Sequence, residues 1–390
     1  MRIAIDFSTV DHLRMSAGHY RYVVQLVRGL AEIGGAQKFL LFGSTKEPVP
    51  ELKEIFLPGS RWIYRRISHW RHRGVYLVDE LAYLRHFLAQ PIALLHVVHN
   101  FIPRCARCPI VVTKHDLIEE ILPEYEATRQ GLFYQIHRQR VENRADCIIC
   151  ISQTTAADLK RFWRIEAERI VAIHHGVEAD FFDEPINDLL RDDPVYHPEN
   201  IVLASPYNLE PRKNVSGLLE AARALAHDFP RLKLVLFGEG LLTPEREKEF
   251  ERRVENLGLR DVVVRPGIIS DAMLKQLYRR ADIFVFPSLY EGFGLPVLEA
   301  LACGGCVLAG AAPAMAEVAG NAAVLIDASE PAKLAGEIAA LLRNPTRRAE
   351  LRRAGPRRAR EFPIEKMVRQ TWETYQMVLQ SGRRKMAVAR

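Results

Sequence analysis

The chain has 390 residues, which is enough for two domains of about 150–200 residues each. Hydrophobic residues make up 48% and charged residues 26%, a globular mixture that excludes a disordered chain, a collagen and a coiled coil. Lys and Arg number 54 against 48 Asp and Glu, so the net charge is +6, which permits an anionic partner without naming one.

The first residues predict a strand and no secretory signal. Asp6 interrupts the apolar run after Met1, and no window of 18 apolar residues occurs in the sequence. We therefore expect a cytoplasmic protein, one that could still lie on the inner face of the plasma membrane.

Strand-like and helical patterns alternate in the first half, as is typical of a parallel α/β sheet. Apolar residues recur at helical spacing between Tyr22 and Leu30. Strands are expected at 2–7, 38–42, 94–98, 110–113, 147–151 and 170–173. Residues 176–199 then turn polar and proline-bearing, as a linker does.

A second alternating run follows the linker. Its strands are expected at 201–205, 232–237, 262–264, 283–286, 307–309 and 323–326, and an Arg-rich helical end begins at Lys333. These patterns predict two doubly wound α/β domains that face each other across a cleft, with boundaries at 1–180 and 181–363.

The strongest candidate site follows the strand expected at 283–286. A glycine-rich turn comes next, and Pro296 stands where a helix begins. Ligands of parallel sheets bind beyond the carboxyl ends of strands, where the backbone N–H groups of Phe293, Gly294 and Leu295 could hold a phosphate. Glu291 and Glu299 could accept hydrogen bonds from the hydroxyls of a sugar or ribose. The plain alternative is two solvated glutamates and a helix cap.

Three further segments follow strands. Arg212 and Lys213, after the strand at 201–205, suit a diphosphate because Arg offers a planar fork and Lys a point charge. His115 and Asp116 end the strand at 110–113, where a histidine is more often structural. Gly18 lies near the start of the first helix, in a loop that could contact phosphates or an acceptor or simply connect two elements.

Several motifs are missing or ambiguous. The sequence has no Gly-x-Gly-x-x-Gly, no P-loop and no Asp-x-Asp, so we expect no dinucleotide cofactor and no metal ligand set. Six cysteines form three Cys-x-x-Cys pairs, whose spacing and apolar context favour small buried residues over a zinc or redox site. They are Cys105/Cys108, Cys147/Cys150 and Cys303/Cys306.

Residues Arg61–Arg73 carry five arginines and three aromatic residues without an acid. On a helix, Ile63, Ile67 and Trp70 would share one face, a pattern that suits an anionic membrane surface. A plain protein surface and an acceptor contact are the alternatives, and single-stranded nucleic acid is the least favoured.

These segments together resemble the retaining glycosyltransferases of family 4, which have the GT-B fold of two Rossmann-like domains. Glu291 to Glu299 is similar to the Glu-x7-Glu motif of that family, Arg212-Lys213 to its diphosphate-binding pair, and His115-Asp116 to its amino-terminal His-Asp. The resemblance covers nearly the whole chain. It also implies that a helix over 364–390 packs back on the first domain.

The resemblance implies a role for each candidate residue. Arg212 and Lys213 would neutralise the nucleoside diphosphate that leaves, Glu291 would hold the donor sugar and Glu299 the ribose. His115 would approach the sugar, and Gly18 would lie near the phosphates. Asn208 is placed in the donor-binding set, although many members have Gly-Arg where this chain has Tyr207-Asn208.

The activity that follows is a metal-independent, retaining hexosyl transfer to a glycan or lipid-linked acceptor of a cell-surface polysaccharide. GDP-mannose is the favoured donor and a UDP-hexose the alternative. A nucleotide-sugar epimerase and a basic binding module without enzymatic activity are the less favoured functions.

Overall fold

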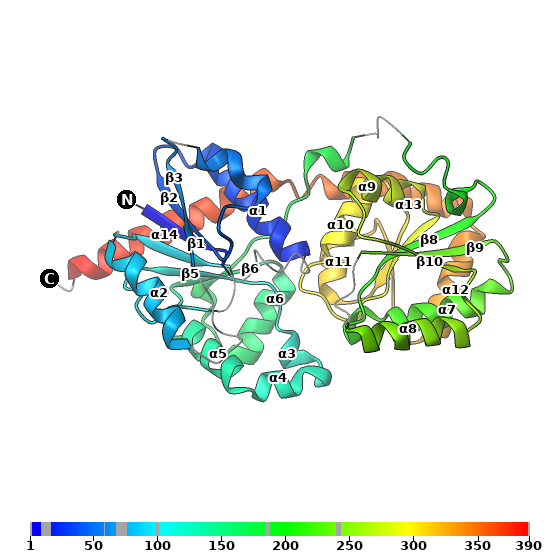
Figure 1. The fold of residues 1–390 in the computed structure, drawn as a ribbon, viewed down its shortest axis with the longest axis horizontal. Coiled ribbons are helices and arrows are strands. Elements are labelled where there is room, and N and C mark those ends of the chain that lie inside the picture. The colour runs from blue at the N-terminus through cyan, green and yellow to red at the C-terminus, as the bar shows by residue number, and fades with distance from the viewer. Residues whose placement is uncertain are drawn as a thin grey trace. The chain divides into compact units, whose positions relative to one another are not determined.

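A computed structural model of the chain describes residues 2–8, 17–57, 59–67, 76–89, 91–98, 101–183, 188–238 and 243–388. The chain divides into two compact units. The first comprises Met1–Gly176 and Ile364–Arg390, and the second Val177–Pro363 (Figure 1). The sequence predicts this boundary after residue 180, and the family resemblance implies that the helix over 364–390 packs on the first domain. None of the helices within the described ranges is long and apolar enough to cross a membrane.

A seven-stranded parallel sheet forms the centre of the first unit. In spatial order its strands are β3 (Trp62–Arg66), β2 (Lys38–Gly43), β1 (Arg2–Asp6), β4 (Leu94–Val97), β5 (Ile110–Lys114), β6 (Cys147–Cys150) and β7 (Ile170–Ala172). The helices are α1 (Ala17–Ile33), α2 (Tyr76–Ala89), α3 (Ile118–Ile121), α4 (Glu126–Gln130), α5 (Leu132–Arg144), α6 (Gln153–Asp158) and α14 (Ile364–Val388).

A six-stranded parallel sheet forms the centre of the second unit. In spatial order its strands are β10 (Val263–Gly267), β9 (Leu232–Phe237), β8 (Ile201–Pro206), β11 (Ile283–Phe286), β12 (Val307–Gly310) and β13 (Val324–Ile326). The helices are α7 (Val215–Ala226), α8 (Pro244–Asn256), α9 (Asp271–Arg280), α10 (Leu295–Ala302), α11 (Pro313–Ala319), α12 (Pro331–Leu342) and α13 (Pro345–Ala359). The two doubly wound α/β folds expected from the sequence are thus confirmed.

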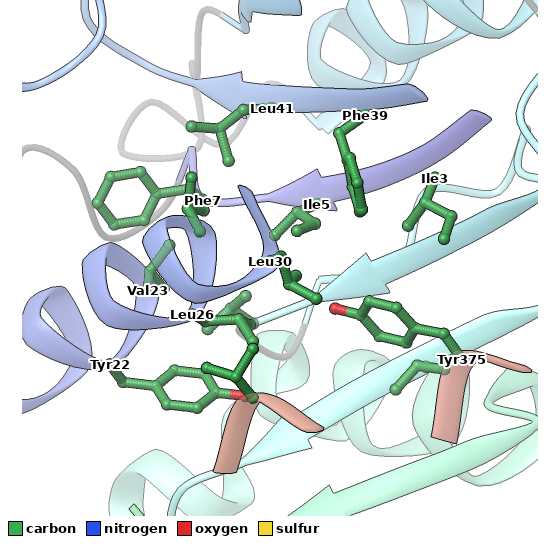
Figure 2. Close-up of a cluster of buried hydrophobic side chains, with 14 of the residues drawn as sticks. Ile3, Ile5, Phe7, Tyr22, Val23, Leu26, Leu30, Phe39, Leu41 and Tyr375 are labelled. Carbon is green, nitrogen blue, oxygen red and sulfur yellow. The ribbon is translucent and has the colours of Figure 1, made fainter. Parts of the chain in front are cut away.

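The strands alternate their side chains between two cores, as the period of two requires. In the first unit, Ile3 and Ile5 of β1 face the core formed with α1 and α14, whereas Ala4 faces the core on the opposite side. Figure 2 shows the first of these cores, where α1 contributes Val23, Leu26 and Leu30 at helical spacing and α14 contributes Tyr375.

The chain leaves the first unit and returns to it at one place. The Val177 amide donates to the Phe362 carbonyl at 3.0 Å, and a parallel bridge pairs Val177 with Pro363. A Cβ atom on Gly176 would lie 2.4 Å from the Cα of Ile364, so only glycine allows the two segments to approach this closely.

The helical expectation for Arg61–Arg73 is wrong in its described part. Trp62–Arg66 forms the edge strand β3, because Trp62 stacks on Phe39 of β2 with ring centroids 4.3 Å apart. Arg65 and Arg66 of this strand are exposed. Residues 68–75, including Trp70, lie outside the described residues, and contact with a membrane stays a prediction.

A chain of buried hydrogen bonds ties α14 and α1 to the first sheet. The Tyr375 hydroxyl lies 2.6 Å from Nδ1 of His96, whose Nε2 lies 2.7 Å from the Thr113 hydroxyl. That hydroxyl lies 3.0 Å from the hydroxyl of Tyr22. Burial lowers the pKa of His96 to about 3, so the imidazole is uncharged at neutral pH and supplies one donor and one acceptor.

We predict that Tyr375→Phe destabilises the first unit by about 1–3 kcal/mol, because it leaves a ring nitrogen of His96 buried without its partner. Tyr20→Phe is the control: it removes a solvent-exposed hydrogen bond to Glu51 and should cost about 0.5 kcal/mol or less. Tryptophan fluorescence during urea denaturation provides the measurement, since all four tryptophans lie in the first unit. Equal losses in the two variants would contradict the prediction.

Candidate functional site

The candidate residues of the second unit lie where its strand order reverses. From β8 the chain proceeds to β9 and β10 on one side of the sheet, and then to β11 on the other. Arg212 and Lys213 follow β8, and Glu291 follows β11, so the two neighbouring strands bring them to the same edge. The Leu289 amide donates to the Arg212 carbonyl at 2.8 Å and joins the two loops. Such a switch point is the usual ligand site of an open α/β sheet.

A largely buried ion cluster joins Arg212, Lys213 and Glu291. The Lys213 Nζ lies 2.6 Å from Oε1 of Glu291, and an Arg212 terminal nitrogen lies 3.0 Å from Oε2. The Nε of Arg212 donates to Glu210 at 2.7 Å. Each oxygen of Glu291 therefore contacts one cation, and the two cations lie side by side.

The charge state of Glu291 follows from these contacts. The residue is only 9% exposed, and burial alone would raise the pKa of its carboxyl group. The charges of Lys213 and Arg212 outweigh that effect and hold the pKa below its usual range. Glu291 is thus ionised at neutral pH, and a ligand that binds the two cations has to compete with it.

The helix that carries Glu299 begins in a tight turn. Gly294 precedes α10 with φ of 101°, a left-handed conformation that favours glycine, and Pro296 lies in the first turn. Glu299 is buried and accepts a hydrogen bond from the Tyr278 hydroxyl at 3.1 Å. Phe293 and Leu295, on either side of Gly294, are buried as well. Binding of a phosphate by the backbone of these three residues stays a prediction.

Two neighbouring residues shape the loop of Arg212. The Asn208 side chain accepts a hydrogen bond from the Glu210 amide at 2.8 Å, which closes a turn before the cations. Asn214 adopts a left-handed conformation and caps α7 by accepting from the Gly217 amide at 3.2 Å. Asn208 therefore stabilises the loop, and its contact with a donor stays a prediction.

Glu210 and Tyr278, the partners of Arg212 and Glu299, were not predicted from the sequence. Glu210 lies two residues before Arg212, so its position was a usable signal. Tyr278 lies on α9, and nothing in the sequence connects it with Glu299 of α10.

The candidate residues of the first unit lie at the carboxyl edge of its own sheet. His115 directly follows β5 and is buried, with its ring centroid 3.9 Å from that of His19. Gly18 is the second residue of α1, and a Cβ atom there would meet no atom of the described residues within 4 Å. The rest of that loop, residues 9–16, lies outside the described ranges.

The six cysteines are free thiols, and four of them are buried. Burial raises the pKa of Cys147 and of Cys303 to about 12, which keeps these thiols protonated at neutral pH. Among the described residues, no group of three His, Cys, Asp or Glu side chains is arranged to hold a metal ion.

Known proteins resemble this chain in sequence and in structure. It is 27% identical over 273 residues to the O-antigen chain mannosyltransferase B of Escherichia coli. The aligned residues cover 69% of this chain and 70% of that protein. It is 32% identical over 214 residues to the serotype-specific mannosyltransferase WbdA of Escherichia coli. The aligned residues cover 53% of this chain but only 26% of that longer protein. The fold is similar to that of Anabaena HepE in complex with UDP and glucose, with a TM-score of 0.77 at 19% identity over 97% of this chain and 100% of HepE.

Two family profiles match successive parts of the sequence. Residues 17–181 match the profile described as Glycosyltransferase Family 4, and residues 188–358 match Glycosyl transferases group 1. The first match contains His115, and the second contains the ion cluster of Arg212, Lys213 and Glu291. The chain therefore belongs to the family 4 glycosyltransferases, with their GT-B fold.

Proposed function

We propose that the protein transfers mannose from GDP-mannose to a glycan or lipid-linked acceptor in the synthesis of a cell-surface polysaccharide. The observation that carries the proposal is the pair of cations held at the switch point of the second sheet. The mannose donor is favoured by the resemblance to two mannosyltransferases, one of which acts on the O-antigen chain according to its name.

In the proposed reaction, the bond between the anomeric carbon and the diphosphate oxygen breaks first. The sugar develops positive charge and the diphosphate develops negative charge, which Arg212 and Lys213 stabilise. The acceptor hydroxyl then attacks from the face that the diphosphate leaves, and a diphosphate oxygen takes its proton. The product keeps the configuration of the donor, without a glycosyl-enzyme intermediate.

The remaining candidate residues would orient the donor. We assign Glu291 to the hydroxyls of the sugar, Glu299 to the ribose, and the backbone of Phe293, Gly294 and Leu295 to the phosphates. The roles of Asn208 and Gly18 in donor binding and of His115 at the sugar are carried over from the family resemblance.

A UDP-hexose is the second candidate donor. It is favoured by the likeness to HepE, whose structure contains UDP and glucose. The two proposals share the diphosphate and differ in the base and the sugar. The ion cluster does not distinguish between the two donors, because it would bind the diphosphate.

Differential scanning calorimetry with GDP, UDP, ADP and dTDP, each with and without EDTA, tests the proposal. A nucleotide at about 100 times its Kd stabilises the unit that binds it by roughly 2.7 kcal/mol. We expect GDP to stabilise the second unit in the presence of EDTA. Stabilisation by UDP alone would favour the second donor, and loss of the effect in EDTA would contradict metal independence. No response to any nucleotide would contradict the proposed function.

We predict that Lys213→Ala lowers the turnover number by ~10²–10³, the usual effect of losing one preorganised partner of a developing charge. Initial rates at saturating donor measure the effect, with Lys233→Ala as the control because its ammonium group donates to the backbone carbonyl of Asp261. Turnover within about threefold of the unaltered enzyme would contradict the role of Lys213.

We predict that Glu291→Gln binds GDP at least about tenfold more tightly, because the amide no longer competes with the diphosphate for the two cations. The same variant should transfer sugar more slowly, since it loses a charged acceptor for the sugar hydroxyls. Isothermal titration calorimetry measures the affinity.

Glu210→Gln is the matched control, because the carboxylate of Glu210 contacts one of the two cations, Arg212, and is more exposed than that of Glu291. It should raise the affinity for GDP by a smaller factor. Unchanged or weaker binding of GDP by Glu291→Gln would show that the carboxylate does not occupy the diphosphate site.

A further inference from the structure

Three aromatic side chains surround His115 and form what we call the ring box: His19, Tyr22 and His175. Their ring centroids lie 3.9, 5.4 and 5.8 Å from that of His115. Tyr22 also meets His175 edge-on at 4.9 Å. The first two residues come from α1 and the third follows β7, so segments far apart in the sequence enclose one imidazole.

Hydrogen bonds fix the backbone of His115 and the side chain of Tyr22 in the ring box. The Thr155 hydroxyl donates to the His115 carbonyl at 3.4 Å. The Tyr22 hydroxyl is the end of the buried chain that runs through Thr113 and His96 to Tyr375 of α14. Because a neutral imidazole offers one donor and one acceptor, this chain is satisfied in either direction. Tyr22 therefore cannot rotate away without breaking a buried hydrogen bond.

Two side chains of the ring box, His175 and Tyr22, carry no charge at neutral pH. Burial lowers the pKa of His175 to about 3 and raises the pKa of Tyr22 well above its usual range. These rings consequently act on His115 through contact and shape. His19 differs from them because it is partly exposed and lies in the first turn of α1.

We propose that the ring box positions His115: His19, Tyr22 and His175 hold its imidazole in the orientation needed at the transferred sugar. This inference rests on the proposed function, in which His115 contacts that sugar. A displacement of about 1 Å in such a group can cost a factor of 10² in rate, so the three rings are positioning residues with a measurable effect.

His19 provides the test, because its ring is the nearest to His115 and its replacement does not open the buried core. His19→Ala should lower kcat by about 10- to 100-fold, with GDP-mannose or UDP-glucose as donor, whichever the enzyme uses. His19→Phe keeps a flat ring and should retain kcat within about threefold of the unaltered enzyme. In His115→Ala, removal of His19 should cause no further loss, because the two residues act as one unit.

The orientation of His115 can be measured without activity. Labelling the 13 histidines with ¹³C at the ring and assigning them by substitution gives one signal for His115. Neighbouring rings should shift this signal in the unaltered protein and in His19→Phe, and His19→Ala should move it toward the position of an exposed histidine.

His137→Ala is the control for a loss of packing alone. His137 is a buried histidine of α5 whose ring lies 4.1 Å from that of Phe133, outside the ring box. It should lower the melting temperature and leave kcat unchanged.

Three outcomes would overturn the inference: an unmoved His115 signal in His19→Ala, an equal loss of kcat in His19→Phe and His19→Ala, or additive losses in the double variant. A lack of transfer by the unaltered enzyme would overturn the proposed function, and the His115 signal would then decide the positioning by itself.

Discussion

The carboxylate of Glu291 keeps Arg212 and Lys213 together in a largely buried place. Two cations side by side repel each other, and burial increases the penalty for each charge. Glu291 offsets both effects by giving one oxygen to each cation at 2.6 and 3.0 Å. The cluster is therefore formed before any ligand arrives, and an anion that binds there exchanges one set of ion pairs for another.

The cluster depends on the parallel sheet beneath it. Adjacent parallel strands end at the same edge of the sheet. The loops that follow β8 and β11 therefore lie close together, although they are about 80 residues apart in the sequence. The hydrogen bond from the Leu289 amide to the Arg212 carbonyl then fixes the distance between those loops. Helix caps at Asn214 and Gly294 determine where each loop ends and its helix begins.

Sequence patterns predicted the features that depend on the order of neighbouring residues, namely the strands and the polar turns that follow them. The strands and the residues that follow them, including Arg212, Lys213, Glu291 and His115, were found because a buried run followed by a polar turn is visible in the sequence. The edge strand β3 was missed, since two of its five residues are arginines and Trp62 alone among them is buried, as an edge strand buries few side chains. The partners from other helices, such as Tyr278 for Glu299, could not be predicted because they depend on how helices pack.

The two units stabilise their polar side chains by different means. The second unit uses opposite charges, which attract strongly in a largely buried place and which, in the proposed function, are exchanged for those of the diphosphate. The first unit packs the rings of His19, Tyr22 and His175 against His115 and ties Tyr22 to α14 through neutral hydrogen bonds. Such contacts hold a side chain in place without competing for an anion. A site that binds and releases a charged group needs ion pairs that can be exchanged, as in the second unit. A group that has to keep one orientation needs packed rings and neutral hydrogen bonds, as in the first unit.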